Sequence, residues 1–280
     1  MRILITGVNG FTGVYLKKEL ENSGHEVFGL NSNLLDLDGI EKEIKTIKPD
    51  CAAHLAAQSF VHSGDIAGIY QSNIIGTHNF LSAISNAAPN IKSIMLASSA
   101  TVYGNKEGCL TEHSSLNPPN DYAVSKMGME KMAKLWFDRL PIFIVRPFNY
   151  TGVGQKNNFL IPKIVDHFKN KSSTISLGNI NVSREFQDVR SIVKYYKELT
   201  VKSPIHQTIN ICSGVSYALS DVVHVCQNLT GHKINIEVNP AFVRKNDAKD
   251  LKGDPTLLQS LIGKGIPYHL EDTLKWMLNS

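Results

Sequence analysis

Tyr122 and Lys126 are the first residues whose types and spacing could do chemistry. They lie in the stretch DYAVSK, which is predicted to be helical, and residues four apart share one face of a helix. An ammonium beside a phenol stabilises the phenolate and lowers the pKa of the tyrosine. The pair therefore predicts a tyrosine that exchanges a proton near neutral pH, although the same spacing is also common on solvated helix faces.

Two serines, Ser98 and Ser99, end the apolar stretch LASS that lies upstream of this helix. A serine hydroxyl at the end of a strand could hydrogen-bond a substrate carbonyl opposite the tyrosine. A strand-end serine followed by a Tyr/Lys helix is more specific than either feature alone.

Three glycines, Gly7, Gly10 and Gly13, follow the first apolar run, RILIT. Glycines between a strand and a helix let backbone N–H groups approach a pyrophosphate at the helix N-terminus. The spacing here is G-x-x-G-x-x-G rather than the usual G-x-G-x-x-G, and a tight turn alone could explain it. Its place after the first strand favours a dinucleotide cradle.

Alternating strand and helix patterns must position these residues. Short apolar runs suit strands buried on both faces of a parallel sheet, and their alternation with helices predicts an α/β fold with a Rossmann-like doubly wound parallel sheet. The predicted strands are residues 2–7, 25–30, 51–57, 91–99 and 141–149, and the predicted helices are residues 11–24, 38–50, 68–87 and 120–140.

The regular alternation of strand and helix patterns ends at about residue 150, after which Gly, Pro and Asn become more frequent. The sequence predicts a Rossmann domain over residues 1–150 and, over residues 151–280, mainly a smaller lobe that binds the substrate. A segment near residues 205–225 is expected to return to the first domain.

Composition excludes several classes of protein. The 280 residues carry a net charge of +4 without a Lys/Arg run, which argues against nucleic acid as a partner. No apolar run is long enough to span a membrane. The four cysteines and ten histidines lack metal-ligand spacing. We expect a cytoplasmic enzyme or binding protein with free thiols and no metal, and His54 is expected to be a satisfied core residue.

With these motifs in this order, the chain resembles the extended short-chain dehydrogenase/reductases that act on nucleotide-diphosphate sugars. The resemblance covers nearly the whole chain. It implies that Ser99, Tyr122 and Lys126 are catalytic, with Ser98 as the alternative serine. It also implies that Tyr122 exchanges a proton with the sugar and that Lys126 holds the nicotinamide ribose.

The resemblance further implies an NADP(H) or NAD(H) site. The end of the second predicted strand carries neither a carboxylate nor an arginine, which favours NADP or dual use. Asp36 resembles an adenine contact, but it could equally cap a helix that begins at Asp38. The implied cofactor-binding residues are Gly7, Gly10, Phe11, Thr12, Gly13, Asn31, Ser32, Asp36, Leu37, Leu55, Ala56, Ala57, Tyr122, Lys126 and Pro147.

The implied partner is a nucleotide-diphosphate sugar, with a GDP-sugar favoured. Two arginines from separate segments, Arg184 and Arg244, could grip one diphosphate, because guanidinium matches phosphate oxygens bidentately. The family's dimer helices correspond to residues 68–81 and 123–136, so a homodimer is expected. The implied substrate-binding residues are Gln58, Ser59, Ser99, Asn149, Arg184, Arg244 and Asp247.

The two residues after Ser99 narrow the choice of reaction type. Dehydratases of this group carry an acid pair there, whereas this chain has Ala100 and Thr101. The second half of the chain is similar to reductases that convert GDP-4-keto-6-deoxy-D-mannose to GDP-D-rhamnose or its C4 epimer. A 4-epimerase of UDP-sugars is the alternative, and a catalytically silent cofactor-binding regulator is a remote one.

Overall fold

A six-stranded parallel sheet forms the centre of the computed structural model, which describes residues 1–59, 65–242, 248–265 and 268–280. The strand order is β11-β6-β4-β3-β1-β2, and every neighbouring pair is parallel. The strands are β1 (Arg2–Thr6), β2 (Glu26–Gly29), β3 (Cys51–His54), β4 (Ser93–Ala97), β6 (Ile142–Pro147) and β11 (Thr208–Ile211). The predicted doubly wound parallel sheet is therefore confirmed.

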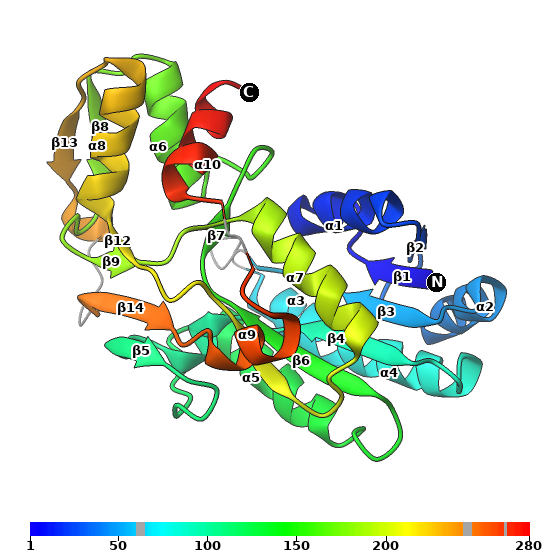
Figure 1. The fold of residues 1–280 in the computed structure, drawn as a ribbon. Helices are drawn as coiled ribbons and strands as arrows, with labels where there is room; N and C mark the ends of the chain where they lie inside the picture. Colours follow the sequence, from blue (N-terminus) through cyan, green and yellow to red (C-terminus); the bar gives the residue numbers. More distant parts are fainter. Residues whose placement is uncertain (60–64, 243–247, 266–267) are drawn as a thin grey trace.

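Helices cover both faces of this sheet (Figure 1). The helices α2 (Leu37–Ile47), α4 (Gly76–Ala87) and α5 (Asp121–Lys134) pack on one face around buried side chains such as Ile44, Phe80 and Met129. The helices α1 (Phe11–Asn22), α7 (Val189–Lys202) and α9 (Thr256–Ile262) pack on the other face. Because both faces are covered, the strands are apolar on both sides.

Two predicted helices differ from those observed. The expected helix over residues 68–87 begins as α3 (Ile66–Tyr70), continues through a π-helical turn (Gln71–Ile75) and ends as α4. The expected helix over residues 120–140 is α5, which ends at Lys134. Trp136 and Phe137 follow it in turns and pack against the core. Apolar periodicity detects neither a π turn nor a helix end that lacks Gly or Pro.

A smaller lobe has its own apolar core. It contains α6 (Leu160–Lys169), α8 (Leu219–Thr230) and α10 (Leu270–Leu278), with β8 (Thr174–Leu177) beside β13 (Asn235–Val238) and the 3₁₀ turn Pro240–Phe242. In Figure 1 this lobe lies at the upper left, beside the carboxyl ends of the main strands.

Short strands from both halves of the chain share two further sheets. One sheet has the order β12 (Tyr217–Ala218), β9 (Ser183–Arg184), β14 (Asp250–Gly253) and β5 (Gly108–Leu110). The other pairs β10 (Gln187–Asp188) with β7 (Tyr150–Thr151). Strand pairs therefore join the chain before residue 150 to the chain after it. In addition, α7 and β11 from the second half pack with the main sheet.

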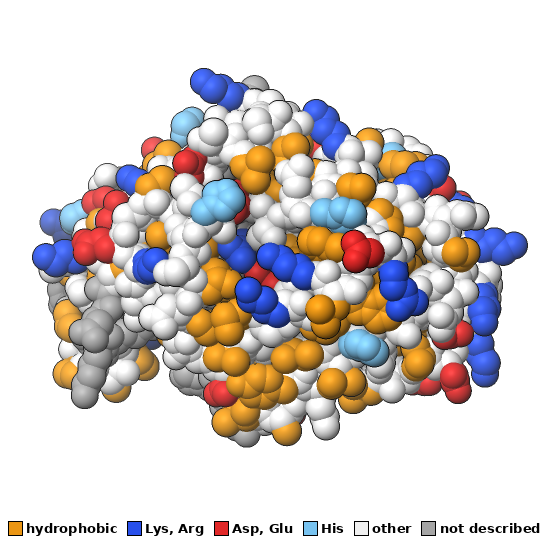
Figure 2. Space-filling view, turned by 90° about the horizontal axis from the view of Figure 1, so that it is seen from below, with side chains coloured by type: hydrophobic (Ala, Val, Ile, Leu, Met, Phe, Trp, Pro, Cys, Tyr) orange, Lys and Arg blue, Asp and Glu red, His pale blue; other side chains and the backbone are white. Residues whose placement is uncertain are grey.

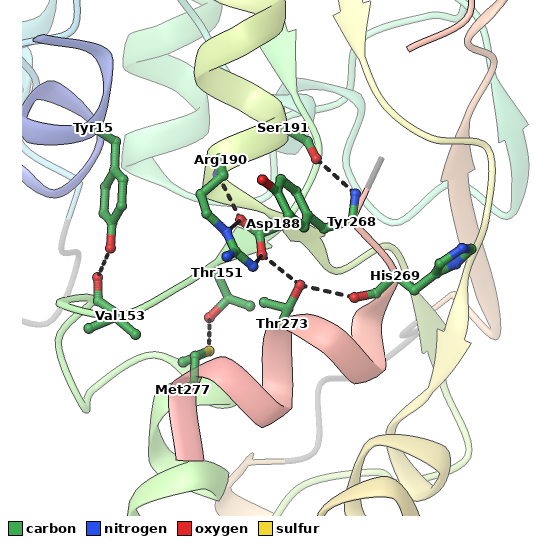
Figure 3. A network of polar contacts seen from close by, with 10 residues as sticks. All are labelled: Tyr15, Thr151, Val153, Asp188, Arg190, Ser191, Tyr268, His269, Thr273 and Met277. Carbon is green, nitrogen blue, oxygen red and sulfur yellow. Dashed lines mark hydrogen bonds and ion pairs between the residues drawn. The ribbon is translucent and has the colours of Figure 1, made fainter. Parts of the chain in front are cut away.

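The C-terminal helix is fixed by a network around Asp188 and Arg190 (Figure 3). The Asp188 carboxylate accepts from Arg190 Nη2 at 2.6 Å and from Thr273 Oγ1 of α10 at 2.7 Å. The Arg190 guanidinium carbon lies 3.9 Å from the ring centroids of both Tyr268 and Trp276, within the range of cation–π attraction. The network thereby holds α10 against the start of α7. In the described ranges, no helix is long and apolar enough to cross a membrane.

Candidate functional site

The glycine loop follows β1 and is shaped for close backbone approach. Gly7 has φ +70°, and a Cβ added there would lie 2.9 Å from the Ala56 nitrogen. A Cβ on Gly13 would lie 2.2 Å from the Gly7 carbonyl oxygen, so only glycine fits at either position. Because α1 begins at Phe11, its first N–H groups are available for an anion. The loop therefore fits the pyrophosphate of a dinucleotide, and Phe11 and Thr12 lie at the helix N-terminus.

The segment after β3 runs beside this loop. The Ala56 N–H donates to Thr6 Oγ1 at 3.1 Å, and the Leu55 N–H donates to the Thr6 carbonyl at 3.3 Å. His54 hydrogen-bonds Thr6 and, at 2.9 Å, Thr77. Burial lowers the pKa of His54 to about 3, helped by the charge of Lys126. His54 is thus a neutral, satisfied core residue, as the sequence suggested.

Asn73 joins that segment to the Tyr/Lys helix. It is buried in the π-helical turn, accepts from the Gln58 N–H at 2.9 Å, and donates to Ser125 Oγ at 2.9 Å. Ala57 and Gln58 are partly buried and Ser59 is exposed. Sequence analysis missed Asn73, although π turns are frequent at functional sites.

The Ser99 hydroxyl lies beside Tyr122, and it accepts from the Thr101 N–H at 3.2 Å and from Thr101 Oγ1 at 2.9 Å. The phenol does not have the lowered pKa that the Tyr/Lys spacing suggested. Burial, helped by the charge of Tyr150, raises the pKa of Tyr122 to about 12, although the neighbouring Ser99 acts in the opposite direction. Desolvation of the anion outweighs any benefit from the lysine, so at neutral pH Tyr122 is a protonated donor.

Lys126 lies on the same helix and is almost fully buried. Its Nζ donates to the carbonyl oxygen of Ala97, at the end of β4, at a distance of 2.7 Å. Burial lowers the pKa of Lys126 to about 8, and Glu130 partly offsets this. The ammonium is therefore tied to the strand that leads into the two serines.

Ser98 points into a buried ionic cluster instead of toward Tyr122. Its hydroxyl donates to Glu130 Oε1 at 2.5 Å, and Glu130 receives Arg146 Nε at 2.8 Å and Nη2 at 2.6 Å. Arg146 Nη1 donates to the Tyr103 hydroxyl at 2.8 Å, and Tyr103 donates to Asn210. The cluster connects β4, α5, β6 and β11 with the 3₁₀ turn Ala100–Tyr103.

Tyr150 is a further residue that the sequence did not single out. Its hydroxyl lies 2.7 Å from Thr12 Oγ1 in the glycine loop, and its charge would raise the pKa of Tyr122. Tyr150 therefore contacts the glycine loop and lies near enough to Tyr122 to influence its pKa. The only sequence signal is its position directly after Asn149.

The residues expected around the adenosine follow β2. Asp36 caps α2 by accepting from the Gly39 N–H at 3.0 Å, so the helix begins at Leu37 and not at Asp38. Asn31 and Ser32 both donate to the carboxylate of Glu43. The capping alternative for Asp36 is thus present in the structure, while its adenine contact stays a prediction.

The residues expected at the sugar are spread over several segments. Pro147 ends β6, and Asn149 is exposed with its carbonyl accepting from the Gln187 N–H at 2.9 Å. Arg184 donates through Nη1 to the carbonyls of Ser183 and Ala248, each at 2.7 Å. The predicted Arg244 and Asp247 lie outside the described residues.

No group of three His, Cys, Asp or Glu residues that could hold a metal occurs in the part of the chain that the structure describes.

Comparisons with known proteins identify the family of this chain. A family model described as "NAD dependent epimerase/dehydratase family" matches residues 3–212. A GDP-6-deoxy-D-talose 4-dehydrogenase from Aggregatibacter actinomycetemcomitans is 35% identical over 271 residues, covering 94% of this chain and 92% of that one. A GDP-6-deoxy-D-mannose reductase from Pseudomonas aeruginosa is 28% identical, covering 99% and 96%.

Solved structures show the same architecture. A Burkholderia cenocepacia crystal structure, provisionally named an epimerase, is 39% identical with a TM-score of 0.95, covering 99% of this chain and 97% of that one. The structure of RMD from Pseudomonas aeruginosa complexed with NADPH has a TM-score of 0.91 at 24% identity, covering 100% and 98%. At that identity it shows the fold alone.

The buried ion pair predicts a large cost for removing one partner. Arg146→Met leaves the Glu130 charge buried without its partner, so we expect the free energy of unfolding to fall by about 3–5 kcal/mol. Urea unfolding measures this change. Removing both charges in Arg146→Met/Glu130→Leu should cost less than Arg146→Met alone.

The matched control is Lys92→Met, which breaks the exposed Lys92–Asp50 pair. That change should cost about 0–1 kcal/mol. Equal effects of Arg146→Met and Lys92→Met would contradict the role given to the buried pair.

Proposed function

Because the chain belongs to the NAD dependent epimerase/dehydratase family, we propose that it performs NAD(P)-dependent oxidoreduction at C4 of a nucleotide-diphosphate 6-deoxyhexose. The motifs place it in the extended short-chain dehydrogenase/reductase branch of that family. The proposed reaction is reduction of GDP-4-keto-6-deoxy-D-mannose. Two relatives named for GDP-6-deoxyhexoses, which align over nearly the whole chain, support this choice.

The observation that carries the proposal is the protonated Tyr122 beside Ser99, on the helix whose Lys126 is held at Ala97 at the end of β4. A reduced nicotinamide, when bound, supplies hydride to the carbonyl carbon. Ser99 and Tyr122 donate to the carbonyl oxygen, and the Tyr122 proton moves to that oxygen as the hydroxyl forms. Lys126, held at Ala97, is proposed to stabilise with its positive charge the phenolate that this step leaves.

The product's configuration at C4 depends on which face of the sugar meets the hydride. We propose GDP-6-deoxy-D-talose as the first product to test, because the relative with that name is the more similar of the two, and GDP-D-rhamnose as the second. Gln58, Ser59 and Asn149 are proposed to bind the sugar, and Arg184 together with Arg244 and Asp247 the nucleotide diphosphate.

The proposed assembly and location follow from the surface and the thiols. Ile66 and Ile75 are exposed, and Leu135 at the end of α5 is 81% exposed. Hydrophobic side chains also gather on the face seen from below in Figure 2. We therefore propose a homodimer through α4 and α5, which sedimentation velocity tests.

Free thiols at all four cysteines support a reducing, cytoplasmic location.

The reaction is tested by following the absorbance of NADPH and, separately, NADH. The purified protein is mixed with GDP-4-keto-6-deoxy-D-mannose that a GDP-mannose dehydratase makes in place, and a parallel arm receives UDP-glucose. We expect stoichiometric loss of the reduced cofactor in the first arm only, and NMR of the product gives the C4 configuration. Interconversion of UDP-glucose and UDP-galactose without net redox change would instead establish the 4-epimerase alternative.

Tyr122→Phe tests the acid directly. The variant should bind cofactor as the wild type does and lose about 10²–10⁴-fold in turnover, because it lacks the proton that the product oxygen needs. Steady-state kinetics and a cofactor titration measure the two properties. Near-normal turnover would remove Tyr122 from the mechanism.

Ser98→Ala and Ser99→Ala distinguish the two serines. Ser98 Oγ donates to Glu130, so Ser98→Ala should retain turnover, whereas Ser99→Ala should lose it. Tyr70→Phe is the control for losing a phenol hydroxyl, since that hydroxyl donates to Asp121 at 2.9 Å and should leave turnover unchanged. The reverse order for the two serines would assign the role to Ser98.

A further inference from the structure

Glu43 places a carboxylate beside the end of β2. Its Oε1 accepts from the Asn31 N–H at 2.8 Å and from Asn31 Nδ2 at 2.9 Å. Its Oε2 accepts from the Ser32 N–H at 3.0 Å and from Ser32 Oγ at 2.7 Å. The side chain comes from α2, two turns after the helix begins at Leu37.

The carboxylate bonds Asn31 and Ser32, the residues expected around the adenosine of the candidate cofactor site. Gly29, the last residue of β2, backs onto the glycine loop, because a Cβ added there would lie 2.4 Å from Val8 Cγ1. Asn31 and Ser32 follow directly. Asn31, Ser32, Lys42 and Glu43 line one open pocket at this edge of the sheet.

The donors that Glu43 occupies are the kind that would otherwise hold a phosphate. Two backbone N–H groups, an amide and a hydroxyl converge on one anion, and that anion is supplied by the chain itself. Burial raises the pKa of Glu43, but the four hydrogen bonds from Asn31 and Ser32 outweigh it and the pKa is lowered. The group is therefore a carboxylate at neutral pH.

A ribose hydroxyl and a ribose phosphate would meet this carboxylate differently. A 2′-hydroxyl can donate to a carboxylate, as it does where an acidic residue ends the second strand. At Glu43 it would share or replace one of the four bonds that Asn31 and Ser32 donate. A 2′-phosphate would bring like charge against it and find the nearby donors already used. Lys42 lines the same pocket with positive charge, and it stays in place in the Glu43 variants, so a change in those variants reports on Glu43.

We propose that Glu43 is a specificity-determining residue that makes the chain prefer NAD(H) over NADP(H), by supplying from α2 the carboxylate that is missing from the end of β2. This rests on the proposed function only in that the glycine loop holds a nicotinamide dinucleotide. It reverses the preference for NADP that the bare strand end suggested.

Equilibrium binding tests this without any sugar substrate. NADH and NADPH are titrated separately into the purified protein by isothermal titration calorimetry. We expect the wild type to bind NADPH at least tenfold more weakly than NADH. Glu43→Gln removes the charge but keeps an acceptor for Asn31, and it should shrink this ratio about tenfold, chiefly by tighter NADPH binding.

A second pair of ligands tests the same discrimination if Glu43→Gln disturbs the Asn31–Ser32 segment. Adenosine 2′,5′-bisphosphate and 5′-AMP differ only in the 2′-phosphate, and their competition against NADH should show the same discrimination in the wild type. Glu43→Ala, which adds no new donor beside Ser32, should lose that discrimination as Glu43→Gln does.

The matched control is Glu41→Gln on the same helix, whose carboxylate accepts from Asn86. It should keep the wild-type ratio. A wild type that binds NADPH as tightly as NADH, an unchanged ratio in both Glu43 variants, or an equal shift in Glu41→Gln would each overturn the proposal. Failure of the sugar reaction with a ratio that depends on Glu43 would overturn the proposed function and leave this inference standing.

Discussion

The buried pair of Glu130 and Arg146 is the interaction on which the candidate active site depends. One carboxylate receives two guanidinium bonds and the hydroxyl of Ser98, so it fixes the end of β4 relative to α5. Lys126 lies one helical turn from Glu130 and bonds Ala97, next to Ser98. The pair thus sets the distance between the strand that carries the serines and the helix that carries Tyr122. Burying two charges is costly, and the cost is offset only while the two charges stay paired.

A second chain of hydrogen bonds connects the glycine loop to the same helix. It runs from Thr6 through His54 and Thr77 to Asn73, and from Asn73 to Ser125 of α5. Every member is buried, and a buried polar chain is stable only when all its groups are paired. Buried hydrogen bonds therefore join the glycine loop to the helix that carries Tyr122, although the two lie more than a hundred residues apart in sequence.

What could be predicted from the sequence was local. The strand before Gly7, the glycine spacing and the shared face of Tyr122 and Lys126 depend on short-range periodicity and sterics. The Glu130–Arg146 pair joins residues of different elements, and nothing in their spacing marks them as partners. The position of Glu43 could not be predicted for a related reason. Its carboxylate comes from α2, and only the fold brings it next to Asn31 and Ser32 after β2. The lowered pKa predicted for Tyr122 was wrong, because the sequence shows that a lysine is four residues away but does not show that the phenol is desolvated.

Burial rather than charge pairing dominates protonation in the candidate site. It raises the pKa of Tyr122 and lowers those of Lys126 and His54, so each shift favours the neutral form. Lys126, with a pKa of about 8, still keeps most of its charge at neutral pH, and Tyr122 keeps its proton. A site in this state holds a proton on Tyr122 and a positive charge on Lys126. These are the forms that the proposed reduction uses, because a carbonyl oxygen gains a proton in that step.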